Sequence, residues 1–374
     1  MMTATEKQQL EPFLSNMQTY CVGRFLVDLP ISLVSDQSSF RVASVYTGHL
    51  DTEIVVEVQP MSLVQFRMAL AKRKNELVTT LIANSKQSML FDVIPLQGKE
   101  GIIFDRVRSD VSELAQRTYE LWSFENGYAK RMLANHWDAT KLKDNSLDTK
   151  TTSQNVMQEL LGFSNKISGR NNTEIPKEAG SCFMNGFMAG PSVAHESPEL
   201  SFHLGGLEDV TLSIVTDNRY SPEVTTYDAI DEEVKSGESI AKEKNGKFRI
   251  IRATELKAKS GVELKEVLME LPTDESYLDD GNNEHFVQGH SFVAESSHAG
   301  QINMPYVKLI LSNGQRLYNR DIRDGDPIPL LKIVSKMDSK KTGNELKKAS
   351  FSEVQTIALW DAILATLRVR SNEF

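Results

Sequence analysis

Cysteine, histidine and surplus positive charge are all scarce in this chain. Its 374 residues include two cysteines and seven histidines, and the formal net charge is −9. No Cys-x-x-Cys pair occurs, which counts against structural zinc and thioredoxin-like redox chemistry. The acidic balance counts against nucleic acid as a partner, because such proteins need Lys and Arg to neutralise phosphates. It also counts against an anionic membrane surface.

Long apolar runs are missing too. No run of about 18 apolar residues is present, so the sequence predicts no membrane span. The first ten residues, Met1 to Leu10, lack the basic and apolar regions of a secretory signal. The sequence therefore indicates either a cytoplasmic protein or one whose signal has been removed. A hydrophobic content of 40% and a charged content of 25% are typical of globular domains.

The chain does contain an internal repeat, in which the same order of sequence features occurs twice. One apolar run begins at Cys21 and stops at Pro30, and another begins at Cys182 and stops at Pro191. Similarly spaced landmarks then follow each run in the same order: strand-like segments 52–58 and 210–216, helix starts near Ser62 and Thr225, and hairpin-like stretches around Gly101 and Gly261. Such self-similarity indicates duplication or a convergent layout. A chance likeness between two ordinary α+β domains is the alternative.

The local patterns are those of an α+β protein. Residues 21–29 are expected to form one strand that ends at Pro30. Residues 40–45 and 52–58 alternate as an antiparallel pair does, and a helix is expected from Ser62. Asn126-Gly127 is typical of a hairpin turn. The capping box at Ser350–Glu353 predicts a final helix. We therefore predict two tandem, structurally related domains, each a largely antiparallel sheet with packed helices. The expected bounds are a polar lead-in at 1–18, an N-terminal α+β domain at 19–165, a linker at 166–179 and a C-terminal α+β domain at 180–374.

The helix that begins near Ser62 carries several cations. A buried stripe is expected at Leu63, Phe66, Leu70, Leu77 and Leu81. Its cations are expected largely on the outer face, where a solvated helix surface is favoured over a basic binding patch: Arg67, Lys72, Arg73 and Lys74.

Recognisable catalytic motifs are scarce. Gly289-His-Ser-Phe-Val293 approaches the Gly-x-Ser-x-Gly nucleophile elbow, but a β-branched residue stands where the strained turn needs glycine. Ser291 is therefore not expected to be a nucleophile. His285 and His290 fall on opposite faces of a strand, and their spacing does not match the zincin motif of a helix. With His298, they are expected to lie at the surface or form hydrogen bonds, and not to bind metal.

The remaining candidates are acidic segments and the cysteines. Asp279–Glu284 lacks the alternating ligands of a calcium loop and reads as an acidic surface turn. Paired-carboxylate catalysis by Asp321, Asp324 and Asp326 has no further support in the sequence. Cys21 and Cys182 have no neighbouring His or Lys, so we expect inert burial in two separate cores and no bond between them. We predict no catalytic, cofactor or metal site, and the sequence assigns no partner-binding residues.

Three segments carry a family resemblance. Tyr20-Cys-Val-Gly-Arg-Phe-Leu-Val-Asp-Leu-Pro30 resembles the N-terminal signature of immunity proteins that protect bacteria from type VI secretion phospholipase effectors. Gly180-Ser-Cys-Phe-Met-Asn-Gly-Phe-Met-Ala-Gly190 resembles the opening of that family's C-terminal domain, and Ala358-Leu-Trp-Asp-Ala-Ile-Leu364 is similar to its ending. The resemblance extends roughly from residue 19 to residue 370. It implies a non-enzymatic inhibitor whose two domains clamp the cognate lipase and block substrate access.

The resemblance also implies a compartment and a partner. Family members usually act in the periplasm, many as lipoproteins, whereas this sequence has neither a signal peptide nor a lipid-attachment cysteine, so a cytoplasmic location is the alternative. The expected partner is the phospholipase effector, with no nucleic acid, small-molecule substrate or cofactor. Two other hypotheses stay open: a cell-envelope enzyme of unfamiliar type with a site between domains, and a non-catalytic adaptor.

Overall fold

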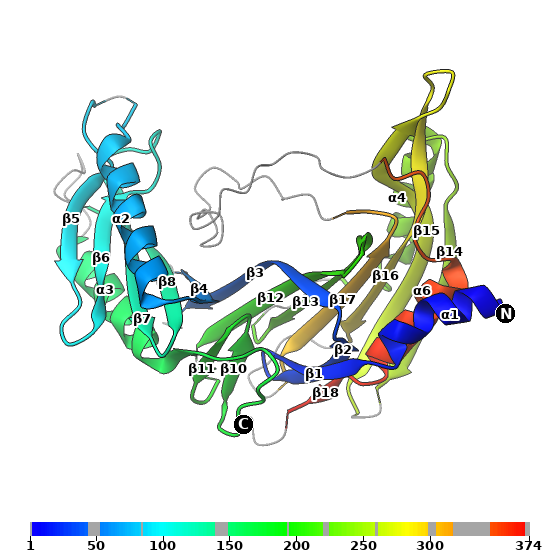
Figure 1. The fold of residues 1–374 in the computed structure, drawn as a ribbon, viewed down its shortest axis with the longest axis horizontal. Helices are drawn as coiled ribbons and strands as arrows, with labels where there is room; N and C mark the ends of the chain where they lie inside the picture. Colours follow the sequence, from blue (N-terminus) through cyan, green and yellow to red (C-terminus); the bar gives the residue numbers. More distant parts are fainter. Residues whose placement is uncertain are drawn as a thin grey trace. The chain divides into compact units, whose positions relative to one another are not determined.

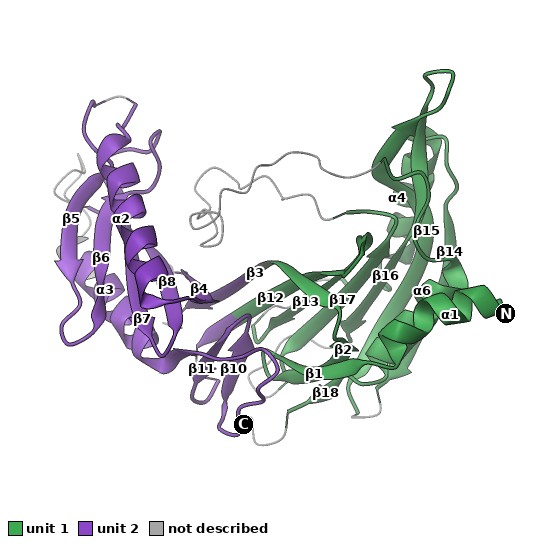
Figure 2. Cartoon of the chain, viewed as in Figure 1, with its two compact units in different colours: residues 1–38, 197–320, 340–374 green, residues 39–196, 321–339 purple. Residues whose placement is uncertain are grey.

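The chain forms two compact units, each built from separate chain segments (Figures 1 and 2). The structure, a computed structural model, describes residues 2–43, 53–83, 85–138, 149–192, 194–219, 224–258, 261–297, 304–316 and 345–370. Unit 1 comprises Met1–Ser38, Ser197–Arg320 and Lys340–Phe374, and unit 2 comprises Ser39–Glu196 and Asp321–Ser339. The predicted α+β class is confirmed, since five helices pack on antiparallel sheets within the described residues.

The main sheet of unit 2 is a four-stranded meander joined to one further strand. In spatial order its strands are β4 (Ile54–Pro60), β8 (Tyr128–Trp137), β7 (Gln116–Glu125), β6 (Glu100–Val107) and β5 (Leu90–Pro95). Each strand runs antiparallel to its neighbour. The chain enters the unit along β3 (Leu33–Ala43), which pairs with β4.

Helices cover both faces of this sheet. Side chains of α2 (Leu63–Thr79), Phe66 and Leu77 among them, cluster with Trp122 of β7. Those of α3 (Thr149–Lys166) cluster with the neighbouring Leu121. Because successive strand residues point to opposite faces, the two helices lie on opposite sides of the sheet. Residue Ser62 begins α2 as predicted, through a capping box with Gln65.

Two details of α2 differ from the sequence prediction. Arg73 is buried rather than outward, because its Nε and Nη2 donate hydrogen bonds of 3.0 Å to both oxygens of Glu120 on β7. Leu81 was expected in the buried stripe but lies beyond the end of the helix and is exposed. A cationic side chain can therefore be buried in the core when a buried carboxylate pairs with it.

Unit 1 repeats the same scheme. The spatial order of its main strands is β12 (His195–Leu204), β13 (Leu207–Asp217), β17 (Tyr306–Asn313), β16 (Glu284–Ser296), β15 (Glu263–Leu278) and β14 (Arg249–Lys257). The helices of the unit are α1 (Ala4–Leu14), α4 (Ile230–Glu243) and α6 (Glu353–Leu364). α1 lies within residues 1–18, which the sequence indicated only as a polar lead-in. α6 packs between α1 and the sheet, where Trp360 meets Phe292 edge to face.

The start of α6 differs from its prediction by two residues. Ser352 and Gln355 form the capping box, in place of the expected Ser350–Glu353 pair. The preceding turn is fixed by Asn313, whose side-chain amide donates to the Phe351 carbonyl at 2.8 Å and accepts from the Phe351 N–H at 3.2 Å. This long-range contact selects the later serine as the N-cap.

The internal repeat is visible in the order of the elements. In unit 2 the chain runs β4–α2–β5–β6–β7–β8, and in unit 1 it runs β13–α4–β14–β15–β16–β17. In both units the last strand of the meander returns to pair with the first strand. A helix and a short strand follow each time: α3 and β9 (Ile167–Gly169), then α6 and β18 (Arg368–Val369). We retain 19–165 and 180–374 as proposed bounds of the two repeats.

Each Cys-to-Pro segment is a β-hairpin, so the prediction of a single strand from Cys21 is wrong. The first hairpin pairs β1 (Met17–Val22) with β2 (Phe25–Pro30), and the second pairs β10 (Gly180–Phe183) with β11 (Gly186–Ala189). Cys21 lies opposite Leu26 and Cys182 opposite Phe187. The two hairpins thus share one register and one loop length, which supports the repeat.

The hairpins are exchanged between the repeats. The short strand that ends the second repeat, β18, pairs with β2 of the first hairpin. The strand that ends the first repeat, β9, pairs with β11 of the second hairpin. This exchange explains why each compact unit is built from parts of both repeats.

Candidate partner-binding cavity

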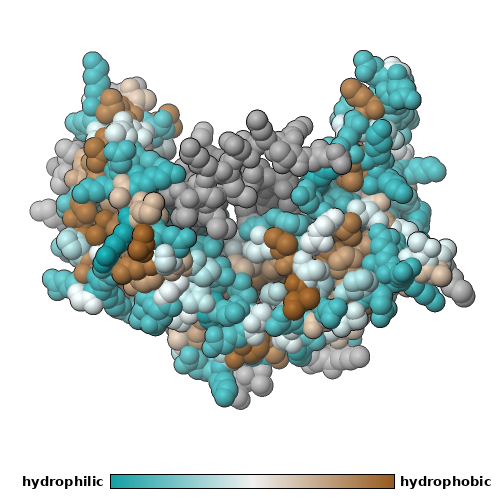
Figure 3. Space-filling view, viewed as in Figure 1, coloured by the Kyte–Doolittle hydropathy of each residue, from teal (hydrophilic) through white to brown (hydrophobic). Residues whose placement is uncertain are grey.

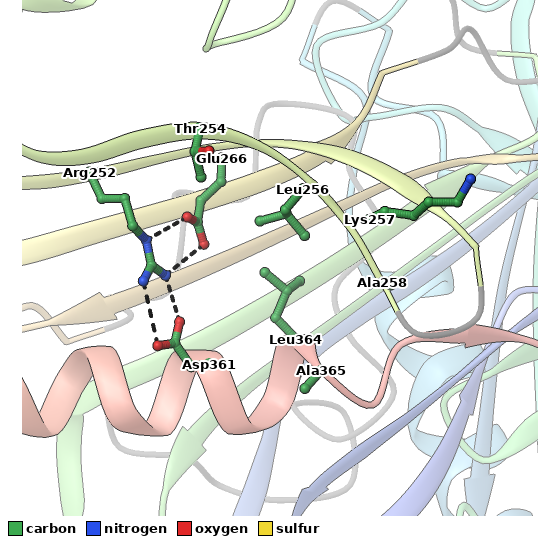
Figure 4. A pocket seen from close by; sticks show the side chains of 9 residues that line it. All are labelled: Arg252, Thr254, Leu256, Lys257, Ala258, Glu266, Asp361, Leu364 and Ala365. Carbon is green, nitrogen blue, oxygen red and sulfur yellow. Dashed lines mark hydrogen bonds and ion pairs between the residues drawn. The ribbon is translucent and has the colours of Figure 1, made fainter.

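Unit 1 contains a cavity of about 340 Å³ between the edge strand β14 and the C-terminal half of α6 (Figure 4). Arg252, Thr254 and Leu256 alternate along β14 and therefore share one face of the sheet. Asp361 and Leu364 lie one turn apart on α6 and face the same space. The full lining is Arg252, Thr254, Leu256, Lys257, Ala258, Glu266, Asp361, Leu364 and Ala365.

One wall of the cavity is a network of paired charges. Arg252 donates from Nε and Nη2 to the two oxygens of Glu266, at 2.7 and 3.0 Å. Its Nη2 also donates to Asp361 Oδ1 at 2.5 Å. Burial acts to lower the pKa of Arg252, but the hydrogen bonds and charges of Asp361 and Glu266 outweigh it and raise that pKa. Arg252 therefore stays charged and fixed against α6.

The opposite side of the cavity is apolar. Leu256 and Leu364 point toward one another across it, while the Lys257 side chain extends away (Figure 4). The charged wall is already satisfied by its own pairs, so an incoming group need not supply a counter-charge. A volume of about 340 Å³ lies at the small end of ligand pockets. The arrangement suits an apolar side chain from a protein partner, held beside the exposed carboxylate of Asp361 and the half-buried guanidinium of Arg252.

The serine singled out by sequence does not lie on a nucleophile elbow. Gly289 to Val293 lies within β16 and forms no strand-to-helix turn. A side chain at Gly289 would meet the Asn313 carbonyl oxygen at 2.4 Å from its Cβ. The absence of a side chain at Gly289 therefore allows β16 and β17 to approach closely.

The histidines of this region form separate hydrogen bonds, as predicted. His290 is buried, and its Nδ1 lies 3.0 Å from the side-chain nitrogen of Asn313. Burial lowers the pKa of His290. His285 is exposed and pairs with Asp279 at 2.9 Å. His298 lies outside the described residues. Across the ranges that the structure describes, no three His, Cys, Asp or Glu side chains gather as a metal site would require.

The acidic segment at Asp279–Glu284 is a surface turn, as predicted. Asp279 Oδ1 accepts the backbone N–H groups of Gly281 and Asn283, at 2.8 and 2.9 Å, and so closes the turn itself. The other acidic candidates, Asp321, Asp324 and Asp326, lie outside the described residues.

The cysteines are buried, as predicted, but they are not thiols. Cys21 is 1% exposed and Cys182 is fully buried. Both are disulfide-bonded, and no cysteine in the described residues is free. The prediction of two separate, unbonded cysteines is therefore wrong. The equivalent positions of the two cysteines in the repeat therefore did not reveal whether either cysteine is disulfide-bonded.

A Ser–His–Asp constellation in unit 2 has no local sequence signal. His136 Nδ1 lies 3.1 Å from Ser153 Oγ, and His136 Nε2 lies 3.5 Å from Asp105. Ser153 Oγ has a competing acceptor in the Trp137 carbonyl at 3.0 Å, and a proton donated there is not available to His136. A nucleophilic serine needs its proton given to the histidine. The contacts instead tie the first turns of α3 to β8.

Two family models match the chain in tandem. The N-terminal domain of Tle cognate immunity protein 4 matches residues 18–170, and the C-terminal domain of the same protein matches residues 174–372. A comparison with curated proteins finds no match. Among the described residues, no helix has the length and apolar character needed to cross a bilayer.

Solved structures share the fold over nearly the whole chain. A chain in the crystal structure of the Tle4–Tli4 complex is 16% identical, with a TM-score of 0.62 over 96% of this chain and 99% of that one. The apo immunity protein TplEi of the Pseudomonas aeruginosa type VI secretion system is 17% identical, with a TM-score of 0.59 over 96% and 98%. The same protein complexed with "L" peptide is 16% identical, with a TM-score of 0.56 over 95% and 99%.

Proposed function

We propose a function from the premise that this chain belongs to the family of Tle cognate immunity protein 4. It is an immunity protein that binds and inhibits a cognate type VI secretion phospholipase effector. The observation that carries this proposal is the match of both domains of the family, in order, across residues 18–170 and 174–372. One structural neighbour comes from the crystal structure of a Tle4–Tli4 complex, which supports a protein as the partner.

The inhibitor acts by binding and not by catalysis. Its two domains clamp the effector and block substrate access to the catalytic pocket. Two contacts on one target multiply their affinities through effective concentration, which suits a toxin whose rare escape does damage. We expect a total buried area of about 1,600 Å² or more and a Kd in the nM range or tighter.

The cavity of unit 1 supplies one of these contacts. Its apolar side between Leu256 and Leu364 would take a single aliphatic or aromatic side chain of the effector. Interfaces concentrate their energy in such central, desolvated anchors. The fixed Arg252–Asp361 pair would border the anchor with polar groups, as interface rims do.

The periplasm is the proposed place of action. Both cysteines are disulfide-bonded, and disulfides persist in oxidising compartments such as the bacterial periplasm. The proposed partner is the effector protein, with no nucleic acid, small-molecule substrate or cofactor.

Co-expression tests the proposal. The effector encoded beside this gene would be sent to the periplasm with or without this protein, and growth, lipase activity and complex formation by size-exclusion chromatography would be followed. We expect restored growth, suppressed lipase activity and a stable complex. Loss of growth despite soluble, folded protein, or a Kd in the high micromolar range, would remove the immunity function.

A matched pair of variants tests the cavity. Ala365→Trp fills the space beside Leu364, and Ala83→Trp adds the same ring at an exposed site in unit 2. We expect at least about tenfold weaker effector binding for Ala365→Trp and no change for Ala83→Trp, since about 1.4 kcal/mol corresponds to a factor of ten. Equal affinities for the two variants would exclude the cavity as a contact.

A further inference from the structure

Helix α2 is apolar on two opposite sides. Its inner side packs into the core through Phe66, Ala69 and Leu77. Its outer side carries a second row at intervals of four and three residues, which places the members in one line along the helix. This row, the outer stripe, consists of Val64, Met68, Ala71, Asn75 and Val78, all exposed.

The apolar members of the outer stripe are strongly exposed. Val64 is 67% exposed, Met68 68% and Val78 46%. Single exposed apolar residues are normal on protein surfaces, whereas a cluster of them often marks an interaction site. Val64, Met68 and Ala71 follow one another in the stripe, and Asn75 separates them from Val78. In Figure 1, α2 lies on the near side of its sheet, and the same view in Figure 3 shows hydrophobic residues at the surface of this part of unit 2.

The repeat provides an internal comparison, because α4 has the same place in unit 1 as α2 in unit 2. The outer residues of α4 are polar, and its exposed charges are predominantly acidic: Asp231, Glu232, Lys235, Glu238, Lys242 and Glu243. The large apolar residues of α4 are Ile230, Val234 and Ile240, none of which is among the exposed ones. A helix at this position therefore does not need an apolar outer side to fold.

The exposed charged residues of α2 itself have one sign. The exposed charged residues of α2 are Arg67, Lys72 and Lys74, all cationic, although the chain has a net charge of −9. Arg67 pairs with Glu100 at 2.8 Å, but both side chains are exposed, so this contact is easily exchanged. The surface that complements α2 is apolar in the centre and acidic at its border.

We propose that the outer stripe of α2 is the surface through which unit 2 contacts the effector. The inference rests on the proposed immunity function and specifies one of the two contacts that a clamp needs. Methionine adapts to irregular partner surfaces, and Met and Arg are enriched at interfaces. An anionic membrane would be a different occupant of an apolar and basic helix face, but the match of both halves of the chain to a family of cognate immunity proteins favours a protein partner.

The first variant places a carboxylate in the stripe. Met68→Glu keeps a good helix former at an exposed position, so the thermal midpoint and the circular dichroism spectrum should not change. We expect effector binding to weaken at least about tenfold in biolayer interferometry. Val111→Glu is the matched control, because Val111 is 66% exposed in the same unit but lies outside α2. Its affinity should equal that of the unaltered protein.

The second variant tests whether the effector surface around the outer stripe is acidic. The double change Lys72→Glu and Lys74→Glu should slow association and reverse the dependence of the association rate on salt, because border charges mainly steer encounter. An unchanged rate at low salt would contradict an acidic border on the effector.

The possible outcomes distinguish the outer stripe from the immunity function itself. If the unaltered protein does not bind the effector, the result contradicts both the immunity function and this inference. If it binds and Met68→Glu binds equally well, only the inference is overturned. Co-sedimentation with phosphatidylglycerol–phosphatidylethanolamine vesicles tests the other occupant. Vesicle binding that is lost in Met68→Glu, with effector affinity intact, would assign the stripe to a membrane instead.

Discussion

The indole of Trp360 donates a hydrogen bond of 2.6 Å to Glu266, a carboxylate without solvent exposure. Unit 2 contains the same combination, in which Trp122 donates to the equally buried Glu120 at 3.0 Å. Each carboxylate also holds an arginine through both of its oxygens. The two sites lie on non-equivalent strands of the repeat, β15 and β7. Each unit thus uses a buried carboxylate, paired and hydrogen-bonded as such a charge must be, to fix a helix to its sheet.

Glu266→Gln should destabilise the protein although the side chain keeps its shape. The change leaves Arg252 without the charge that faces it inside the unit. Breaking a fully buried ion pair costs about 3–5 kcal/mol, but the Arg252 side chain is 35% exposed and water offsets part of this. We expect a loss of about 2 kcal/mol in the free energy of unfolding, measured with urea.

Asp361→Asn is the matched control for that prediction. Asp361 binds the same guanidinium at 2.5 Å, but its side chain is 50% exposed. Exposed ion pairs contribute up to about 1 kcal/mol, so this variant should lose clearly less stability than Glu266→Gln. Equal losses would mean that burial of Glu266 is not what makes its pair important.

The cavity and the outer stripe should act as two separate contacts. Ala365→Trp and Met68→Glu lie in different compact units and share no side-chain partner. Distant sites without shared partners usually have additive effects. The loss of binding free energy in the double variant should therefore equal the sum of the single losses, measured by interferometry at one salt concentration. A double variant no weaker than the worse single variant would contradict two independent contacts.

The disulfide-bonded state of the cysteines predicts a thiol count. Unfolded in guanidinium without reductant, protein from the periplasm should show no reactive thiol, and after reduction it should show two. Reduction should also lower the free energy of unfolding by about 2–4 kcal/mol. Cys21→Ser should leave one reactive thiol under the same unfolding conditions. Two thiols in the unreduced protein would contradict the assignment.

Local signals in the sequence predict part of this fold. The capping residue Ser62, the hairpin turn at Asn126–Gly127 and most of the doubled landmarks depend on neighbours in the chain and are found in the structure. The helix expected to start near Thr225 instead begins at Ile230. The hairpin turn at Gly23 was missed because the apolar run continues through it. Gly23 has a φ of +55°, and a Cβ there would lie 2.1 Å from the Thr216 hydroxyl oxygen.

The other features of the fold depend on contacts between residues that lie far apart in the sequence. The exchange of hairpins depends on β18 meeting β2 and β9 meeting β11, and no residue in these short strands specifies its partner. The cavity joins Leu256 to Leu364, which lie far apart in sequence, so no motif could reveal it. Arg73 was assigned to the surface because its partner Glu120 is likewise distant. The domain bounds and the site assignments stay predictions.

The cluster around Glu120 predicts how unit 2 responds to acid. Arg106 donates to this carboxylate at 2.5 Å and Arg131 at 3.0 Å, in addition to Arg73. Burial alone would raise the pKa of Glu120, but the charges of the three arginines outweigh it and hold that pKa well below the ordinary 4.5. The folded state therefore binds this proton less tightly than the unfolded state does.

The sign of the pH dependence follows from that difference. The stabilisation from Glu120 is fully present above a pH of about 4.5 and is lost as the pH falls below it toward the folded pKa. Glu120→Gln removes the charge, so the stability gap between the unaltered protein and this variant should stay constant from about pH 8 to pH 5 and narrow below about pH 4.5. Urea unfolding at four pH values measures the gap. Glu100→Gln, which alters an exposed pair screened by solvent, should show a clearly smaller gap. A Glu120 gap that stayed constant to about pH 3 would mean that the arginines do not depress this pKa relative to the unfolded chain.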